Sequence, residues 1–159
     1  MTAAIEAPSL AWIALGGNLG DACQSVQQAI AALESLPQTR LEAASSLYRT
    51  APVDATGPDF INAVARLRTT LSPLALLHAV QGLEQQAGRE RSYRNAPRTL
   101  DLDVLLYSGV SQQTAELELP HPRMTQRAFV LVPLAEIDPE LVPATLLQAV
   151  ADQAIERLV

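Results

Sequence analysis

The segment Arg98-Thr99-Leu100-Asp101-Leu102-Asp103-Val104-Leu105-Leu106-Tyr107 carries the clearest pattern in this chain. From Leu100 onward it has the character of a buried strand, because it is aliphatic and is entered from Pro97. Side chains alternate between the two faces of a strand, so one face is expected to be apolar and the other to carry both aspartates. The first face comprises Leu100, Leu102, Val104 and Leu106, and the second comprises Asp101, Asp103, Leu105 and Tyr107.

Asp101 and Asp103 place two negative charges on one face of this strand. Residues i and i+2 lie roughly 6.6 Å apart along a strand, and the paired carboxylates suit two divalent cations about 3.5–4 Å apart. Unpaired anions on a buried sheet are costly, so a positive partner is expected. The partner is either a pair of metal ions or an arginine, such as Arg98, in a structural ion pair.

Composition is that of a single globular domain over residues 1–159, with residues 1–9 frayed. The chain is 48% hydrophobic and 18% charged, which excludes a disordered protein. The apolar run at residues 10–15 is too short to span a bilayer, and no basic segment precedes it, so we expect no membrane association or secretion. Cys23 is the only cysteine, which excludes an internal disulfide and fits a cytoplasmic protein.

Charge is distributed unevenly along the chain. The net charge of −6 argues against a nucleic-acid partner or an anionic membrane. All basic residues are arginines, and Arg89, Arg91, Arg94 and Arg98 gather against a single acid, Glu90. Arginine grips phosphate or carboxylate through two hydrogen bonds. The cluster therefore predicts a local anion site, with a solvated surface loop as the alternative.

Outward from residues 98–107, hydrophobic periodicity predicts alternating strands and helices. Strands are predicted over 10–15, 41–48 and 60–70, with an edge strand over 116–119, and residues 129–134 are apolar. Helices are predicted over 21–36, from Ser72-Pro73 to 87, as a turn over 123–127, and over 145–158. The order β-α-β-β-α-β is typical of an α+β, ferredoxin-like antiparallel sheet, with helices packed on one face and the active site on the other.

Two short motifs leave structural and functional interpretations open. The glycine-rich turn at 16–21 lies between a strand and a helix, where it either cradles phosphate or only turns the chain. His121 stands between two prolines, as a ligand or phosphate contact or as part of an ordinary turn.

Several motifs, in order and over nearly the whole chain, resemble the 6-hydroxymethyl-7,8-dihydropterin pyrophosphokinases of folate biosynthesis. They are Gly16-Gly-Asn-Leu-Gly20, Ser46-Leu-Tyr-Arg-Thr50, Pro58-Asp-Phe-Ile-Asn62, Gly88-Arg89-x-Arg91, Pro97-Arg-Thr-Leu-Asp-Leu-Asp103, Pro120-His-Pro-Arg123 and Arg127-x-Phe129. The resemblance implies an ATP-dependent diphosphokinase that transfers diphosphate from MgATP to the pterin hydroxymethyl group and releases AMP. It also implies ATP and 6-hydroxymethyl-7,8-dihydropterin as partners, and we expect a monomer.

The same resemblance implies roles for individual residues. Asp101 and Asp103 would bind two Mg²⁺ ions, and Arg89 and Arg98 would join them as catalytic residues. Contacts to ATP would come from Gln81, Glu84, Arg91, Arg94, Arg98, His121 and Arg127. Contacts to the pterin would come from Thr50, Val53, Phe60, Asn62 and Phe129, in which the two phenylalanines stack on the ring and the amide binds its polar edge.

Two other classes of protein compete with this hypothesis. A ferredoxin-like RNA-binding module is disfavoured by the net charge and by the lack of aromatic ribonucleoprotein motifs. A two-metal phosphoesterase would usually show more histidine ligands than His78 and His121. The arginines suit charge stabilisation, because a guanidinium does not usefully deprotonate, and no general base is assigned.

Overall fold

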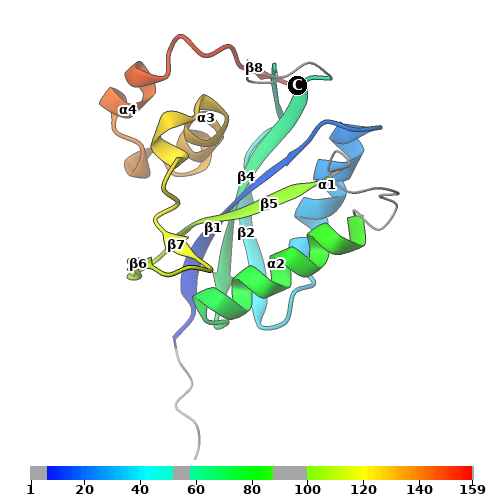
Figure 1. The fold of residues 1–159 in the computed structure, drawn as a ribbon, viewed down its shortest axis with the longest axis vertical. Helices are drawn as coiled ribbons and strands as arrows, with labels where there is room; N and C mark the ends of the chain where they lie inside the picture. Colours follow the sequence, from blue (N-terminus) through cyan, green and yellow to red (C-terminus); the bar gives the residue numbers. More distant parts are fainter. Residues whose placement is uncertain (1–6, 52–57, 88–99, 159) are drawn as a thin grey trace, which may run out of the picture.

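A six-stranded antiparallel sheet forms the centre of the computed structural model, which describes residues 7–51, 58–87 and 100–158 (Figure 1). Its strands are β1 (Ser9–Gly17), β2 (Thr39–Ala44), β3 (Tyr48–Thr50), β4 (Phe60–Thr69), β5 (Asp101–Tyr107) and β8 (Glu156–Arg157). They follow the order β5-β1-β4-β3-β8, and β2 also pairs with β4. β1 lies between β4 and β5, and the predicted α+β fold with an antiparallel sheet is confirmed.

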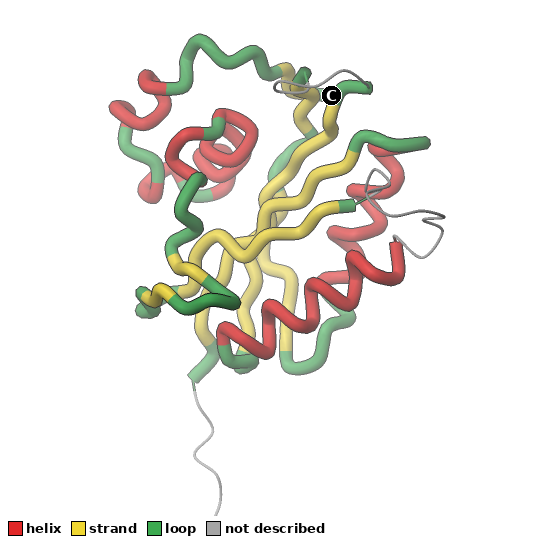
Figure 2. The backbone as a smooth tube through the Cα atoms, viewed as in Figure 1, coloured by secondary structure: helices red, strands yellow, loops and turns green. Residues whose placement is uncertain are grey.

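Helices α1 (Ala22–Leu33) and α2 (Pro73–Ala87) cover one face of the sheet (Figure 2). Their apolar sides pack on alternate residues of β4 and β5 in one continuous core. Each helix begins at a capping side chain: Asp21 accepts a hydrogen bond from the N–H of Gln24 (3.1 Å), and Ser72, the cap expected from Ser72-Pro73, accepts one from that of Ala75 (3.1 Å). Both sequence-predicted helices are therefore confirmed.

Helix α3 (Ala128–Ile137) packs on the opposite face of the sheet, where the sequence predicted only an apolar run (Figure 1). Its buried residues join Trp12, Val64 and Leu105 in a second core. The short α4 (Ala144–Ala149) and the 3-10 turns η1 (Met124–Gln126) and η2 (Pro139–Leu141) flank it. The second face is thus shared between α3 and the pocket described below. No helix in the described parts of the chain has the length and apolarity needed to cross a membrane.

Strand β5 contains a bulge that changes the predicted faces of its second half. Ile13 of β1 pairs with Val104 and Trp12 pairs with Leu106, so Leu105 is an extra residue. Beyond the bulge the alternation is inverted: Leu106 packs in the core under α3, and Tyr107 packs in the core under α1 and α2. The prediction for these two residues was wrong, whereas Asp101 and Asp103, before the bulge, keep the predicted face.

The strand predicted over 41–48 is split into β2 and β3, which pair with successive parts of β4. Ser45 lies at the break and bonds to Val64 twice: its N–H donates to the carbonyl (2.8 Å), and its hydroxyl accepts the Val64 N–H (3.0 Å). A side-chain oxygen here replaces the carbonyl that a continuous strand would offer. The chain can therefore bend away from β4 without leaving a buried N–H unsatisfied.

The prediction of one helix over 145–158 was wrong beyond its first turns. Helix α4 ends at Ala149, and Glu156–Arg157 forms β8. The apolar residues that suggested one helix belong to different cores: Val150 packs under α3, and Leu158 packs under α1 and α2. One straight helix cannot reach both. The predicted edge strand at 116–119 is realised as β7 (Glu118–Leu119), which pairs with β6 (Gln112–Gln113) in a separate hairpin.

Candidate active site

A pocket of about 280 Å³ opens on the second face of the sheet, beside α3. Strands β1, β3, β4 and β5 form its floor and sides, and the start of α3 forms another wall. The predicted site residues that line it are Thr50, Phe60, Asn62, Asp101, Asp103, Arg127 and Phe129. The structure therefore brings together residues that were predicted as metal, ATP and pterin contacts.

The carboxylate pair lies where β5 enters the sheet. Asp101 pairs with Gly16 of β1, and Asp103 pairs with Ala14, so the strand beside the carboxylates carries small residues. Asp101 is exposed and Asp103 is half-buried. No set of three or more potential metal-ligating side chains gathers anywhere in residues 7–51, 58–87 and 100–158. Two carboxylates nevertheless suit Mg²⁺, which commonly takes one or two from the protein and its other ligands from phosphates and water.

Asn62 and Thr50 form a buried polar pair across β3 and β4. The Asn62 side-chain amide donates to the Thr50 hydroxyl at 2.8 Å, and the two residues are only 5% and 8% exposed. The hydrogen bond fixes the orientation of the amide. A buried amide held in this way presents a defined polar edge to a ligand.

Gly16 supports this arrangement, although the sequence suggested that it belonged to a turn. It lies in β1, paired with Asn62 on one side and Asp101 on the other. A Cβ atom at Gly16 would approach the Asn62 side-chain oxygen to 2.9 Å. Asn62 can therefore lie against β1 only because residue 16 has no side chain. At the turn itself, Asp21 caps α1, which supports the structural interpretation of that motif.

Two phenylalanines form the aromatic part of the pocket, and an arginine lies against one of them. Phe60 comes from the first residue of β4, and Phe129 comes from the first turn of α3. The Arg127 guanidinium carbon lies 5.3 Å from the centroid of the Phe129 ring, within the range of a cation–π interaction. Arg127 therefore lies next to the aromatic wall and also lines the pocket.

His121 lies close enough to Asp103 and Arg127 to feel both charges, although it does not line the pocket. Burial lowers the pKa of the imidazole; Asp103 opposes that shift, and Arg127 and Arg123 reinforce it. Its Nδ1 accepts the backbone N–H of Arg123 at 3.2 Å. The neutral ring therefore carries its proton on Nε2, which makes it a hydrogen-bond donor for an anionic oxygen.

Glu84 and Gln81 lie on α2, across the sheet from the pocket. The Glu84 carboxylate accepts the backbone N–H of Leu102, the residue between the two aspartates, at 2.7 Å. Gln81 is exposed one helical turn away. The remaining predicted residues, Val53, Arg89, Arg91, Arg94 and Arg98, lie outside the residues that the structure describes.

Sequence comparison places this chain in a known family. Residues 12–139 match the family described as 7,8-dihydro-6-hydroxymethylpterin-pyrophosphokinase (HPPK). A Pseudomonas aeruginosa protein named 2-amino-4-hydroxy-6-hydroxymethyldihydropteridine pyrophosphokinase is 47% identical over 131 residues, which cover 82% of this chain and 81% of that protein. A Bacillus subtilis protein of the same name is 42% identical over 130 residues, which cover 81% and 78%.

Solved structures agree on the fold. A Plasmodium falciparum HPPK-DHPS structure superimposes with a TM-score of 0.67 at 15% identity, over 86% of this chain and 43% of that one. The chain belongs to the 7,8-dihydro-6-hydroxymethylpterin pyrophosphokinase family. It is an ATP-dependent diphosphokinase of folate biosynthesis, and like ATP-using kinases in general it uses Mg²⁺.

Proposed function

We propose that this enzyme transfers diphosphate from MgATP to the hydroxymethyl group of 6-hydroxymethyl-7,8-dihydropterin, with release of AMP, in the pocket beside α3. The observation that carries the proposal is that one pocket holds both a carboxylate pair and a buried, oriented amide next to aromatic rings. A metal-loaded triphosphate requires the first feature, and a flat polar heterocycle requires the second.

The pterin subsite consists of Thr50, Val53, Phe60, Asn62 and Phe129. Phe60 and Phe129 supply flat apolar surface, and Asn62 supplies a hydrogen-bonding edge that Thr50 holds in place. Both kinds of contact are needed, because an apolar slot alone would leave the polar atoms of the heterocycle without partners. Substrate discrimination then depends mainly on the amide.

Asp101 and Asp103 would hold two Mg²⁺ ions, which would neutralise charge on the ATP phosphates. The protein contributes rigidity: β1 fixes one edge of β5, and Glu84 accepts the N–H of Leu102. The two carboxylates are thus held before the substrates arrive.

The remaining contacts to ATP come from side chains around the carboxylate pair. His121 donates from Nε2 to a phosphate oxygen, and Arg127 provides a positive charge at the pocket wall. Arg89 and Arg98 stabilise charge as the bond to AMP breaks, and Arg91 and Arg94 bind the triphosphate. Gln81 and Glu84, on α2 across the sheet, contact the part of the nucleotide that extends beyond the pocket. The enzyme acts as a cytoplasmic monomer without nucleic-acid or membrane partners.

Nucleotide products test the reaction directly. The protein is incubated with MgATP in the presence and absence of 6-hydroxymethyl-7,8-dihydropterin, and the products are separated by chromatography. We expect AMP and the pterin diphosphate, formed only when both substrates are present, because the hydroxyl attacks the β-phosphorus. ADP as the main product, or equal AMP formation without pterin, would overturn the proposal.

A further inference from the structure

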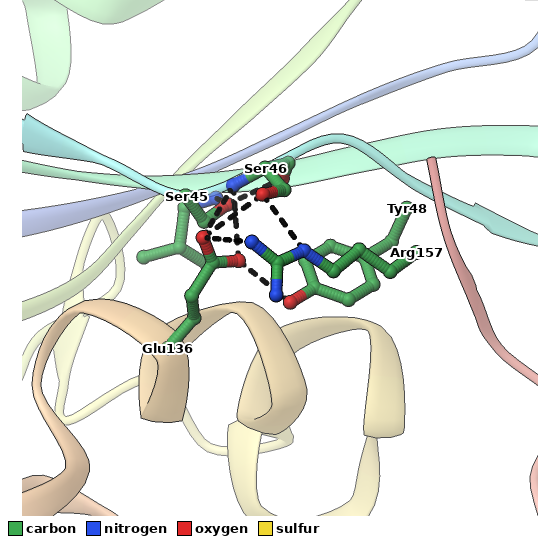
Figure 3. Close-up of polar contacts among 6 residues, drawn as sticks. Ser45, Ser46, Tyr48, Glu136 and Arg157 are labelled. Carbon is green, nitrogen blue, oxygen red and sulfur yellow. Dashed lines mark hydrogen bonds and ion pairs between the residues drawn. The ribbon is translucent and has the colours of Figure 1, made fainter. Parts of the chain in front are cut away.

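Helix α3 carries Phe129 in its first turn and Glu136 in its last. The two residues are seven positions apart, which places them on the same side of the helix, roughly 10 Å from each other along its axis. Phe129 lines the pocket at one end, and Glu136 reaches across to the β2–β3 connection at the other (Figure 3). One helix side therefore bears both an aromatic wall of the pocket and an anionic anchor.

The Glu136 carboxylate gathers donors from segments far away in the sequence (Figure 3). Both of its oxygens accept the Ser46 N–H at 3.0 Å. Oε2 also accepts the Ser46 hydroxyl at 2.9 Å, and Oε1 accepts the Tyr48 hydroxyl at 2.6 Å. Arg157 of β8 lies 3.6 Å from the carboxylate and donates to the Ser46 hydroxyl at 3.0 Å. We call Ser46, Tyr48, Glu136 and Arg157 the α3 anchor.

The α3 anchor is joined to the other wall of the pocket through β3. Tyr48 pairs with Asn62 across the sheet, and Thr50, two residues further along β3, accepts the Asn62 amide. Tyr48, Thr50 and Asn62 are all buried. The anchor thus bonds α3, which carries Phe129, to the short strand that orients the amide.

The Glu136 carboxylate of the anchor is ionised near neutral pH, and the hydroxyl of Tyr48 donates to it. Burial alone would raise the pKa of Glu136, but hydrogen bonds from Tyr48 and Ser46 and the charge of Arg157 lower it overall. Burial, together with the bond to Glu136, raises the pKa of Tyr48 to about 12. Tyr48 therefore remains a donor to an ionised acceptor, a pairing stronger than one between neutral groups.

We propose that Glu136 and Tyr48 are positioning residues for the pterin subsite: they set the distance between Phe129 and the Asn62–Thr50 pair without touching the substrate. This inference rests on the proposed function of the pocket. Small misplacements of a binding wall weaken binding strongly, because stacking and the edge hydrogen bond must be made together.

The test compares two tyrosine-to-phenylalanine variants. Y48F removes the hydroxyl bond to Glu136, and Y107F removes an equally short bond, 2.6 Å to the Leu71 carbonyl, under α1 and α2. We expect Y48F to raise the KM for pterin by about fivefold to tenfold, as the loss of about 1–1.4 kcal/mol predicts. The KM for ATP should change by less than about twofold, and Y107F should change neither constant. Equal kinetics for Y48F and Y107F would overturn the inference.

A double-mutant cycle separates this inference from the proposed subsite. If Tyr48 acts through Phe129, the double variant should change the free energy that corresponds to the KM for pterin by less than the sum of the changes caused by Y48F and F129A alone. Fully additive effects would overturn the positioning role. If F129A alone leaves pterin binding unchanged, the subsite proposal fails. If F129A weakens it while Y48F does not, the subsite stands and only the anchor is refuted. E136Q, which keeps the side-chain shape, should reproduce the Y48F pattern.

Discussion

At the scale of single residues, the pocket depends on a few side chains whose neighbours leave them room. Asp101 and Asp103 project from β5 beside Gly16 and Ala14 of β1, and Asn62 lies against Gly16 from β4. Small residues in the central strand therefore allow charged and polar groups from both flanking strands to face one pocket. Any side chain larger than that of glycine at residue 16 would disturb this arrangement.

Replacement of either aspartate by asparagine should abolish catalysis and leave the fold intact. Asp101 is exposed and Asp103 is half-buried, so each change should alter the free energy of unfolding by less than about 1 kcal/mol. Loss of one anionic ligand should reduce the rate of AMP formation by at least about 100-fold. Circular dichroism and turnover measured on the same preparations check both parts. A folded variant with near-native turnover would contradict the metal assignment.

Replacement of Gly16 by alanine should weaken pterin binding selectively. The added Cβ would lie 2.9 Å from the Asn62 side-chain oxygen, so the amide must shift away from its bond with Thr50. We expect a rise of about tenfold in the KM for pterin and little change in that for ATP. Gly82 is the matched control, because a Cβ there meets nothing within 4 Å. Isothermal titration with each substrate checks this prediction. An equal loss of affinity for pterin and for ATP would contradict it.

Much of this pocket could be predicted from the sequence because its residues come from recognisable motifs. Phe60 and Asn62 are two positions apart in β4, so strand alternation alone places both on one face, and both line the pocket. The contribution of Gly16 could not be predicted, because its strand position depends on pairing with β4. Glu136 gave no sequence signal, since its partner Ser46 lies 90 residues away.

At the scale of secondary-structure elements, the helices and strands with one apolar stripe were predicted, and those whose ends depend on distant partners were not. α1 and α2 follow from local periodicity and caps. The end of α3 is determined by tertiary contacts: Asp138 accepts the Trp12 indole N–H at 2.7 Å across 126 residues and pairs with Arg66 at 2.6 Å. Local pattern carries no information on such pairings.

The attachment of α3 should show a defined pH dependence. The pKa of Glu136 in the folded protein lies below its unfolded value of 4.5. Its contribution to stability is therefore complete above about pH 4.5 and is lost as the pH falls through the folded pKa. E136Q should cost about 1–2 kcal/mol near neutral pH. In urea titrations, the difference between wild type and E136Q should shrink at acidic pH; a difference that stays constant would contradict the role of the charge.

At the scale of the whole molecule, one sheet lies between two hydrophobic cores. α1 and α2 cover one face and α3 covers the other, while β1 and β4 contribute residues to both cores. Because these strands are shared, neither core can be lost without exposing the other. The two sides should therefore unfold as one cooperative unit.

Trp12, the only tryptophan in the sequence, lies in the core under α3, whereas Leu76 lies in the opposite core. L76A should destabilise the protein by about 2–5 kcal/mol. The midpoint of unfolding measured by Trp12 fluorescence should fall together with that measured by far-ultraviolet circular dichroism. Two separate transitions in the variant would show that the cores are independent.

The pairing of β8 with β3 has a practical consequence for where another polypeptide is attached. A fusion joined after Leu158 would begin next to Tyr48 and Arg49, the partners of Arg157 and Glu156 and close neighbours of Thr50. An affinity tag ahead of Ser9 would begin where β1 meets Thr69, roughly 30 Å along β4 from Phe60. For immobilised binding assays, attachment ahead of Ser9 therefore leaves the pocket unobstructed.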